Sequence, residues 1–274
     1  MEAGAAMPVA VVTGASSGIG EATARELGRR GWYCVLVARR RERLEPLAAQ
    51  LGGEFELCDV SERADVDRTA AAILERHPRI DLLVCNAGIP GRGDFFSLEP
   101  ERIEAVMRTN YLGGVWCVRA LEPGLQPGSH VVNVVSVAGT VAFAPAGPYA
   151  ASKHAQLAFS RSLTGLLAAR GVHVHTVLPG FVETEGFPQQ AVLRSAFFRR
   201  AVIGPQTVAT RLVDAVESGR RELFVPWWYR LFAVGQALLP GLSARLVARS
   251  GYRRPPSSRP PLPSATDGAA PDGV

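Results

Sequence analysis

The sequence is poor in the residues that build metal sites and disulfide frameworks. Its cysteines contain no CxxC pair and lie in apolar runs, which favours buried, reduced thiols. No group of His, Cys, Asp or Glu has metal-ligand spacing, so no metal is expected. No charged and apolar leader opens the chain, so we expect a cytoplasmic protein. The four cysteines are Cys34, Cys58, Cys85 and Cys117.

The chain also has almost no lysine. Of its 30 basic residues, 29 are arginine and one is Lys153. Arginine carries a planar guanidinium, whereas lysine carries a compact ammonium on a flexible stem. Lys153 lies four residues after Tyr149, which places both side chains on one face of a helix. The one position that keeps an ammonium group therefore lies beside a phenol.

Most of the chain has no net positive charge, although the whole chain has a net charge of +5 and a pI of about 9.4. Residues 1–219 contain 22 basic and 22 acidic residues, whereas residues 220–254 contain seven arginines and one acidic residue, Glu222. A nucleic-acid binder usually spreads basic residues over a binding face with exposed aromatics, and no nucleic-acid motif occurs. We therefore expect no nucleic-acid partner.

Short apolar runs alternate with longer helix-like stretches, and no internal repeat is found. This alternation is typical of right-handed βαβ units, so we expect one α/β domain with a doubly wound parallel sheet of about seven strands covered by helices on both faces. Ligands in such sheets bind beyond the carboxyl ends of the strands. The expected strands are Val9–Thr13, Tyr33–Ala38, Glu54–Cys58, Asp81–Cys85, His130–Ser136, His173–Leu178 and Glu222–Val225.

A glycine-rich turn follows the first expected strand and opens the first helix. Its spacing is G-x-x-x-G-x-G over Thr13–Gly20. Glycine lets backbone amides approach a pyrophosphate, which the helix N-terminus attracts, although a purely structural turn is the alternative. The predicted cofactor contacts in this turn are Gly14, Ser16, Ser17, Gly18, Ile19 and Gly20.

Arginines end the second expected strand, at Arg39 and Arg40. An acidic residue at this place would accept hydrogen bonds from a ribose 2′-hydroxyl, whereas arginine accommodates a 2′-phosphate. The alternative is that these arginines cap the strand and solvate the next helix. We predict NADP(H) as the cofactor in preference to NAD(H).

With these residues in place, the chain resembles the short-chain dehydrogenase/reductase family over roughly residues 7–226. The resemblance implies a Rossmann-type fold and assembly as a homodimer or homotetramer through the helices that bear Asn110 and Tyr149. The matching motifs are Thr13–Gly20, Cys58-Asp59-Val60, Asn86-Ala87-Gly88, Asn110, Ser136, Tyr149-x-x-x-Lys153 and Pro179-Gly180-Phe181-Val182-Glu183-Thr184.

The resemblance also implies roles for individual residues. It places Asp59, with Val60, beside the adenine and lets Asn110 hold a water that links Lys153 to solvent. Thr184 would reach the carboxamide of the nicotinamide. The remaining cofactor contacts that it implies are Asn86, Ala87, Gly88, Tyr149, Lys153, Pro179, Gly180 and Val182.

The predicted chemistry is general acid/base catalysis by Tyr149. A free tyrosine has a pKa of about 10, and a nearby cation lowers such a pKa by about 1–3 units. The Tyr149 hydroxyl would protonate a carbonyl oxygen as hydride arrives, or deprotonate an alcohol in reverse. Ser136 would hydrogen-bond the same oxygen as charge develops there.

The end of the chain goes beyond the domain of residues 1–226. Residues 227–254 form an apolar and basic extension that is expected to be helical, and residues 255–274 are rich in Pro and Ser and are expected to be disordered. Residues 227–249 fit a helix that covers the pocket or a subunit interface better than a peripheral membrane contact. Phenylalanines suggest an apolar substrate pocket, and these are Phe143, Phe181, Phe187, Phe197 and Phe198.

The sequence therefore predicts an NADP(H)-dependent oxidoreductase that interconverts a carbonyl and a secondary alcohol on a small, lipophilic substrate. One alternative is a 3-oxoacyl-thioester reductase of fatty-acid-type metabolism. Another is a non-catalytic sensor that binds NADPH, against which the set Asn110, Ser136, Tyr149 and Lys153 argues. A binding module has no need of a poised phenol.

Overall fold

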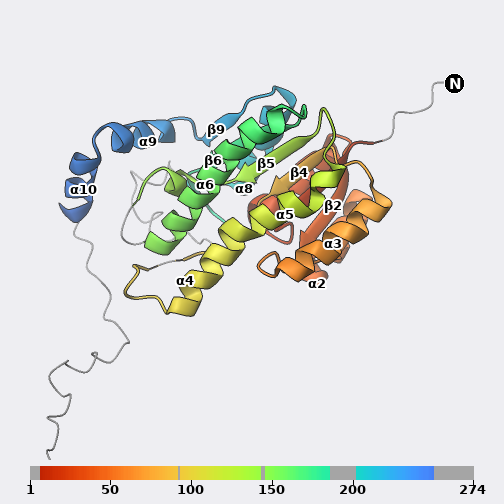
Figure 1. Cartoon of the computed structure of the whole chain (residues 1–274), viewed down its shortest axis with the longest axis horizontal. Helices are drawn as coiled ribbons and strands as arrows, with labels where there is room; N and C mark the ends of the chain where they lie inside the picture. Colours follow the sequence, from red (N-terminus) through yellow and green to blue (C-terminus); the bar gives the residue numbers. More distant parts are fainter. Residues whose placement is uncertain (1–6, 92, 143–145, 186–201, 250–274) are drawn as a thin grey trace, which may run out of the picture.

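The computed structural model describes residues 7–91, 93–142, 146–185 and 202–249, and its central element is a sheet of seven parallel strands (Figure 1). These strands are β1 (Val9–Thr13), β2 (Tyr33–Ala38), β3 (Glu54–Leu57), β4 (Leu82–Cys85), β5 (His130–Val134), β6 (His173–Pro179) and β9 (Glu222–Val225). They are ordered β3-β2-β1-β4-β5-β6-β9. The predicted doubly wound sheet is confirmed, and every predicted strand lies within two residues of its expected ends.

Helices cover both faces of this sheet. Successive side chains of each strand point to opposite faces, so each face has its own apolar core. In β1, Ala10 and Val12 pack into one core, whereas Val11 packs into the other. The first core is completed by α1 (Gly18–Arg29), α2 (Arg41–Leu51) and α8 (Pro205–Glu217). The second is completed by α3 (Arg63–Arg76), α5 (Gly113–Leu121) and α6 (Gly147–Ala168).

The helix expected around Asn110 is present, and its middle turn is π-helical. It consists of α4 (Pro100–Met107), a π-helical turn at Arg108–Leu112 and then α5. A π turn changes the backbone hydrogen bonding locally and is often found at functional sites. Asn110 is completely buried in this turn.

The strand order reverses between β1 and β4, and this switch point positions the site. The chain leaves β1 and β4 towards opposite sides of the sheet, which opens a crevice at the carboxyl ends of the two strands. The glycine turn follows β1, and Asn86 follows β4. The polar motifs therefore converge at one edge, as the sequence predicts.

After β9, the chain forms two short helices, α9 (Tyr229–Leu238) and α10 (Pro240–Arg249), which lie at one end of the molecule (Figure 1). Both helices lie within residues 227–254, for which a helical extension is expected, and residues 250–274 lie outside the described part of the chain. Two further strands of two residues, β7 (Phe181–Val182) and β8 (Val202–Ile203), pair with each other. Within the described ranges, no helix is both long and apolar enough to cross a membrane.

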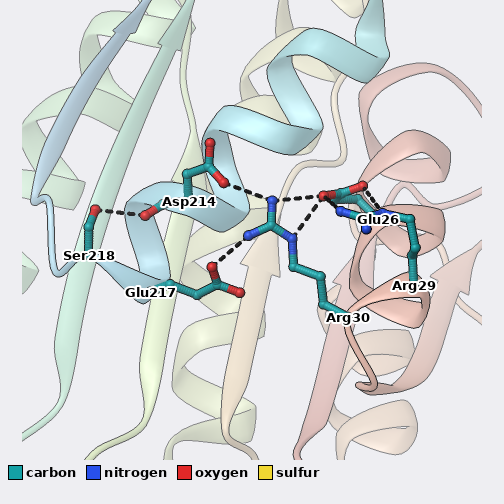
Figure 2. A network of polar contacts seen from close by, with 6 residues as sticks. All are labelled: Glu26, Arg29, Arg30, Asp214, Glu217 and Ser218. Atoms are coloured by element: carbon teal, nitrogen blue, oxygen red, sulfur yellow. Dashed lines mark hydrogen bonds and ion pairs between the residues drawn. The ribbon is translucent and has the colours of Figure 1, made fainter.

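An ion-pair network joins the first and last helices of one face, α1 and α8 (Figure 2). Glu26 is 3% exposed, and its Oε1 lies 2.7 Å from Nη2 of Arg29 and 2.8 Å from Nη2 of Arg30. Arg30 also lies 2.7 Å from Asp214 and 2.6 Å from Glu217 on α8. Arg30 is therefore the residue that bridges the two helices.

Replacing Arg30 with alanine is expected to lower the free energy of unfolding by about 2–3 kcal/mol. The variant leaves Glu26 buried with one partner fewer and removes both contacts with α8. Chemical denaturation measures this loss. Arg29→Ala is the matched control, and its effect is expected to be clearly smaller because the Arg29 side chain is 67% exposed. Equal losses from both variants would contradict the bridging role.

The same network predicts a loss of stability in acid. The hydrogen bond from Arg29, supported by Arg30 against the opposing effect of burial, lowers the pKa of Glu26 from 4.5 to about 2. The stabilisation is therefore fully present above about pH 4.5 and is lost as the pH falls towards 2. Between these values, Glu26→Gln should unfold with a shallower dependence on pH than the parent protein.

Candidate active site

A cavity of about 750 Å³ opens at the carboxyl edge of the sheet. It receives residues from the loops after six strands, β1 to β6, and from the start of α6. Of the predicted cofactor contacts, all except Gly20 line this cavity, and so do the predicted catalytic residues Ser136, Tyr149 and Lys153. The structure therefore brings together residues that are more than 160 positions apart.

The glycine turn after β1 is shaped by close backbone approaches. Gly14 has φ of +67°, and a Cβ placed there would lie 2.8 Å from Cα of Ala87. A Cβ on Gly20 would overlap the carbonyl oxygen of Gly14. Any side chain at these two positions would push the turn away from β4 and α1, so the cradle at the N-terminus of α1 requires glycine. Gly20 thus determines the shape of the turn although it does not line the cavity.

The loop after β4 is tied to β1 by its polar groups. The Asn86 side chain donates to the carbonyl oxygen of Thr13 at 3.0 Å, and its backbone amide donates to Thr13 Oγ1 at 3.0 Å. The Thr13 hydroxyl in turn donates to the carbonyl of Val84. These bonds hold Asn86, Ala87 and Gly88 against the glycine turn, where they form one cavity wall.

Arginines lie at the rim of the cavity beside the glycine turn. Arg40 donates to Oγ and to the carbonyl oxygen of Ser16, both at 3.2 Å, and lies 3.4 Å from a carboxylate oxygen of Glu185. Arg39 is largely exposed and lies 3.3 Å from Asp59. These arginines therefore face the cavity, which differs from the alternative in which they only solvate the next helix.

Asp59 is held as a carboxylate at the end of β3. Its Oδ1 accepts hydrogen bonds from the backbone amide and the hydroxyl of Ser61, at 2.9 and 2.7 Å. Burial acts to raise the pKa of Asp59, but the hydrogen bonds from Ser61 and from Arg39 outweigh it and lower the pKa below its usual value. Asp59 thus places a fixed negative charge in the cavity beside Arg39.

Ser136 and Tyr149 form a hydroxyl pair at the opposite end of the cavity. Ser136 follows β5, accepts a hydrogen bond from the amide of Ala138 at 3.1 Å and contacts the carbonyl of Pro179 at 3.4 Å. Tyr149 lies on the first turn of α6 and is half-buried at the cavity wall. The protein around the phenol limits its hydration, which raises the pKa of Tyr149 to about 12, and the hydrogen bond between the two hydroxyls acts in the opposite direction.

Lys153 is 4% exposed, one turn further along α6. Its Nζ donates to the carbonyl oxygen of Val134 at 3.0 Å and to Oε1 of Gln156 at 2.7 Å, and it lies 5.9 Å from the centre of the Tyr149 ring. Burial lowers the pKa of Lys153 from 10.5 to about 7. The compact ammonium is therefore almost sealed inside the protein.

The expectation that Lys153 lowers the pKa of Tyr149 is wrong for the free protein. The two residues share one face of α6 as predicted, but the ammonium points to Val134 and Gln156. Burial raises the pKa of the phenol and lowers that of the amine, so each neutral form is favoured. For both residues, burial is the largest cause of the change in pKa.

Asn110 does not line the cavity, and its side chain is fully used. Its Oδ1 accepts from the amide of Ile89 at 2.7 Å, and its Nδ2 donates to the Ile89 carbonyl and to Oγ of Ser152, both at 3.1 Å. The side chain therefore joins the π turn to the β4 loop and to α6. The family resemblance implies a water link from Asn110 to Lys153, and these side-chain contacts leave that link to the backbone of the turn.

The loop after β6 closes the cavity with Pro179, Gly180, Val182 and Thr184. Thr184 lies against Gly18 of the glycine turn, within 3.1 Å of a Cβ placed there. Of the phenylalanines expected in the pocket, Phe181 lines the cavity, whereas Phe143, Phe187, Phe197 and Phe198 lie outside the described residues.

Glu185 and Tyr229 also line the cavity, although neither is among the predicted site residues. The extension that contains Tyr229 is expected to cover the pocket or a subunit interface. Glu185 pairs with Arg40 across 145 positions, and Tyr229 reaches the wall from α9. Tyr229 is 5% exposed and packs so closely on Gly180 that any Cβ there would overlap its ring. One signal for Tyr229 is present in the sequence, namely the aromatic run Trp227-Trp228-Tyr229 that begins two residues after β9.

The four cysteines are free and buried, as expected. In the described part of the chain, no group of three or more His, Cys, Asp or Glu residues could hold a metal ion.

Comparisons with known proteins agree with this geometry. A family model described as short chain dehydrogenase matches residues 8–191. A protein of Streptomyces coelicolor with the provisional name "ketoacyl reductase" is 37% identical over 222 residues, which cover 77% of this chain and 84% of that protein.

Solved structures are similar over most of the fold. A crystal structure of a variant actinorhodin polyketide ketoreductase with NADPH has a TM-score of 0.72 and 30% identity, and the match covers 81% of this chain and 97% of the other. A short chain dehydrogenase from Burkholderia cenocepacia in complex with NADP has a TM-score of 0.73 and 26% identity, with 79% and 95% covered.

Proposed function

The chain belongs to the short-chain dehydrogenase/reductase family, and on this basis we propose that it is an NADP(H)-dependent oxidoreductase that interconverts a carbonyl and a secondary alcohol. One observation carries the proposal. A single cavity has a glycine cradle and two arginines at one end, and Ser136, Tyr149 and Lys153 at the other. A nucleotide with a reactive ring fits this division into a phosphate end and an acid/base end.

The cradle end supports the choice of cofactor. The space left by Gly14 and the N-terminus of α1 suits a pyrophosphate, and Arg39 and Arg40 suit an adenosine 2′-phosphate. Asp59 and Val60 would contact the adenine, and Asn86–Gly88 would line the cleft. Thr184 would hold the nicotinamide carboxamide above Gly18. The structural relatives with NADP or NADPH support the same assignment.

At the other end, the residues divide the acid/base work. The cofactor, when bound, supplies or accepts the hydride. Tyr149 donates its hydroxyl proton to the carbonyl oxygen during reduction and removes it from the alcohol during oxidation. Ser136, held by Ala138, stabilises the negative charge on the same oxygen. Lys153 holds the ribose and returns a proton towards Tyr149, and the backbone of the Asn110 turn connects Lys153 to solvent through water.

The substrate is proposed to be a lipophilic carbonyl compound. Phe181 and Tyr229 form an aromatic wall at the substrate end, with their ring centres 6.3 Å apart. A 3-oxoacyl-thioester is the second candidate, which the names of the Streptomyces coelicolor relative and of the actinorhodin ketoreductase favour. A screen of ketones, aldehydes and 3-oxoacyl-thioesters, followed by NADPH absorbance, tests both. If the protein binds NADPH but turns over no compound, the result would favour the alternative function, a non-catalytic sensor.

Arg39→Ala is expected to weaken NADPH binding about 10–100-fold and to leave NADH binding within about twofold. The reason is that a guanidinium contributes charge-assisted hydrogen bonds to a phosphate that NADH lacks. Fluorescence titration of both cofactors measures the two affinities. Arg68→Ala is the matched control, because Arg68 is an exposed arginine that pairs with Asp65 outside the cavity. An unchanged preference in Arg39→Ala, or tighter binding of NADH by the parent, would contradict the assignment to NADP(H).

Assembly and location are part of the same proposal. We place a homodimer or homotetramer interface on α5 and α6, the helices next to Asn110 and bearing Tyr149. The cytoplasm is the proposed location, and the four free thiols support it.

A further inference from the structure

The helix α9 exposes apolar residues on its outer face, where a helix that only covers a domain would have polar residues. Tyr229, Ala233 and Gln236 follow the helical spacing i, i+4, i+7 and form the less exposed face. Leu231, Val234 and Leu238 follow the same kind of spacing on the outer face, and they are 65%, 45% and 74% exposed. A surface helix normally places polar residues there, so this outer face requires an occupant.

The exposed apolar surface continues beyond α9, and we call it the apolar patch. It lies over the start of α9, the turn to α10 and the first residues of α10. Its members are Trp227, Leu231, Phe232, Val234, Leu238, Leu239 and Leu242. Contiguous apolar surfaces of this kind mark interaction sites. Figure 1 shows α9 and α10 at one end of the molecule, beyond the layers that cover the sheet.

The charged residues of the segment that carries the apolar patch have one sign. Between Glu222 and Asp267 the sequence has six arginines and no acidic residue. Arg230 and Arg245 are exposed, and neither forms an ion pair with any part of the chain that the structure describes. An apolar face that carries tryptophan and is bordered by unpaired arginines matches the chemistry of an anionic bilayer surface.

The same charge disfavours a second copy of the chain as the occupant. In a two-fold interface the patch meets itself, so Arg230 and Arg245 would approach the same arginines of the other copy. The segment offers no carboxylate to compensate them. A bilayer with anionic headgroups pairs with each of these arginines.

We propose that the apolar patch of α9 and α10 docks the protein on the surface of an anionic lipid bilayer. The inner face of α9 contributes Tyr229 to the cavity wall, so docking places the cavity beside the lipid phase. Lipophilic carbonyl compounds dissolved in the membrane would then reach the cavity without crossing water. Binding to the bilayer does not depend on the hydride chemistry proposed above.

The test is flotation of the full chain with vesicles of phosphatidylcholine alone or mixed with phosphatidylglycerol. We expect the parent protein to float with the mixed vesicles, and the bound fraction to fall as salt screens the arginines. Leu231→Glu/Leu238→Glu should lower the partition coefficient at least about tenfold, since it puts two charges into the apolar face. Arg230→Gln/Arg245→Gln should lower it about fivefold for each arginine.

The matched control is Leu166→Glu. Leu166 is 70% exposed, close to Leu238 in exposure, and lies near the C-terminal end of α6, whereas the cavity residue Tyr149 lies on the first turn of this helix. It should float like the parent. NADPH binding should be unchanged in all variants, which shows that each is folded.

Two results would overturn the proposal. One is that the parent stays at the bottom of the gradient with both kinds of vesicle. The other is that Leu231→Glu/Leu238→Glu floats like the parent but changes from oligomer to monomer in sedimentation velocity. The second result would assign the apolar patch to a contact between copies of the chain.

Discussion

Tyr149→Phe is expected to reduce turnover of any accepted carbonyl by about 10²–10⁴-fold while NADPH binds within about twofold of the parent. The substitution removes one oxygen atom from a ring that stays in its place on α6. Ser136 can still hydrogen-bond the substrate oxygen. It cannot replace the Tyr149 hydroxyl as the group that transfers a proton to this oxygen. The loss therefore belongs to kcat, and single-turnover absorbance changes measure it.

Tyr111→Phe is the matched control for this variant. Tyr111 lies in the π turn, and its ring packs edge-on against Phe159 on α6 with the centres 6.3 Å apart. Because its hydroxyl does not line the cavity, its removal should leave turnover within about twofold of the parent. Retained turnover in Tyr149→Phe would remove the tyrosine from the proposed chemistry, and equal losses in both variants would point to a structural cause.

The high pKa of Tyr149 affects how the reaction rate is expected to depend on pH. With a pKa of about 12, the phenol keeps its proton at every ordinary pH, so it is ready to act as the acid in reduction. In oxidation, the proton that Tyr149 removes from the alcohol must pass on to a further acceptor, and Lys153 is a cavity residue with a pKa of about 7. In the free protein, a pH effect near 7 would thus belong to the amine and not to the phenol.

Much of this site could be predicted because its signals are local. The strands are short apolar runs, and the glycine turn, Arg39 and Arg40, and Asn86 each follow one of them directly. In a parallel sheet, the carboxyl ends meet at one edge, so sequence order alone brings these groups together. The Tyr149 and Lys153 pair is also local, because four residues make one helical turn.

What could not be predicted depends on contacts between distant parts of the chain. The pairing of Arg40 with Glu185 and the approach of Tyr229 to Gly180 arise from the packing of loops and of α9. The π turn at Asn110 follows from its side-chain bonds to Ile89 and Ser152, for which helical periodicity gives no signal. The orientation of Lys153 is of the same kind, since Val134 comes from β5.

Lys153→Met is expected to abolish turnover and, in the absence of cofactor, to raise the free energy of unfolding by about 1–3 kcal/mol at neutral pH. The folded pKa of about 7 lies below the usual 10.5, so the unfolded chain binds a proton between these values that the folded chain releases. The cost of burying the amine is therefore largest below pH 7 and disappears as the pH rises to 10.5. The gain in the variant is reduced because Val134 and Gln156 lose a donor.

Denaturant unfolding across this pH range measures the effect. The parent should gain stability from about pH 7 to 10, and Lys153→Met should show a flatter profile. Lys153→Arg separates charge from shape: a guanidinium keeps the charge but is too large for a site that is 4% exposed, so it should lose both turnover and stability. Full turnover in Lys153→Arg would mean that any cation suffices. A less stable Lys153→Met would mean that the two hydrogen bonds outweigh the cost of burial.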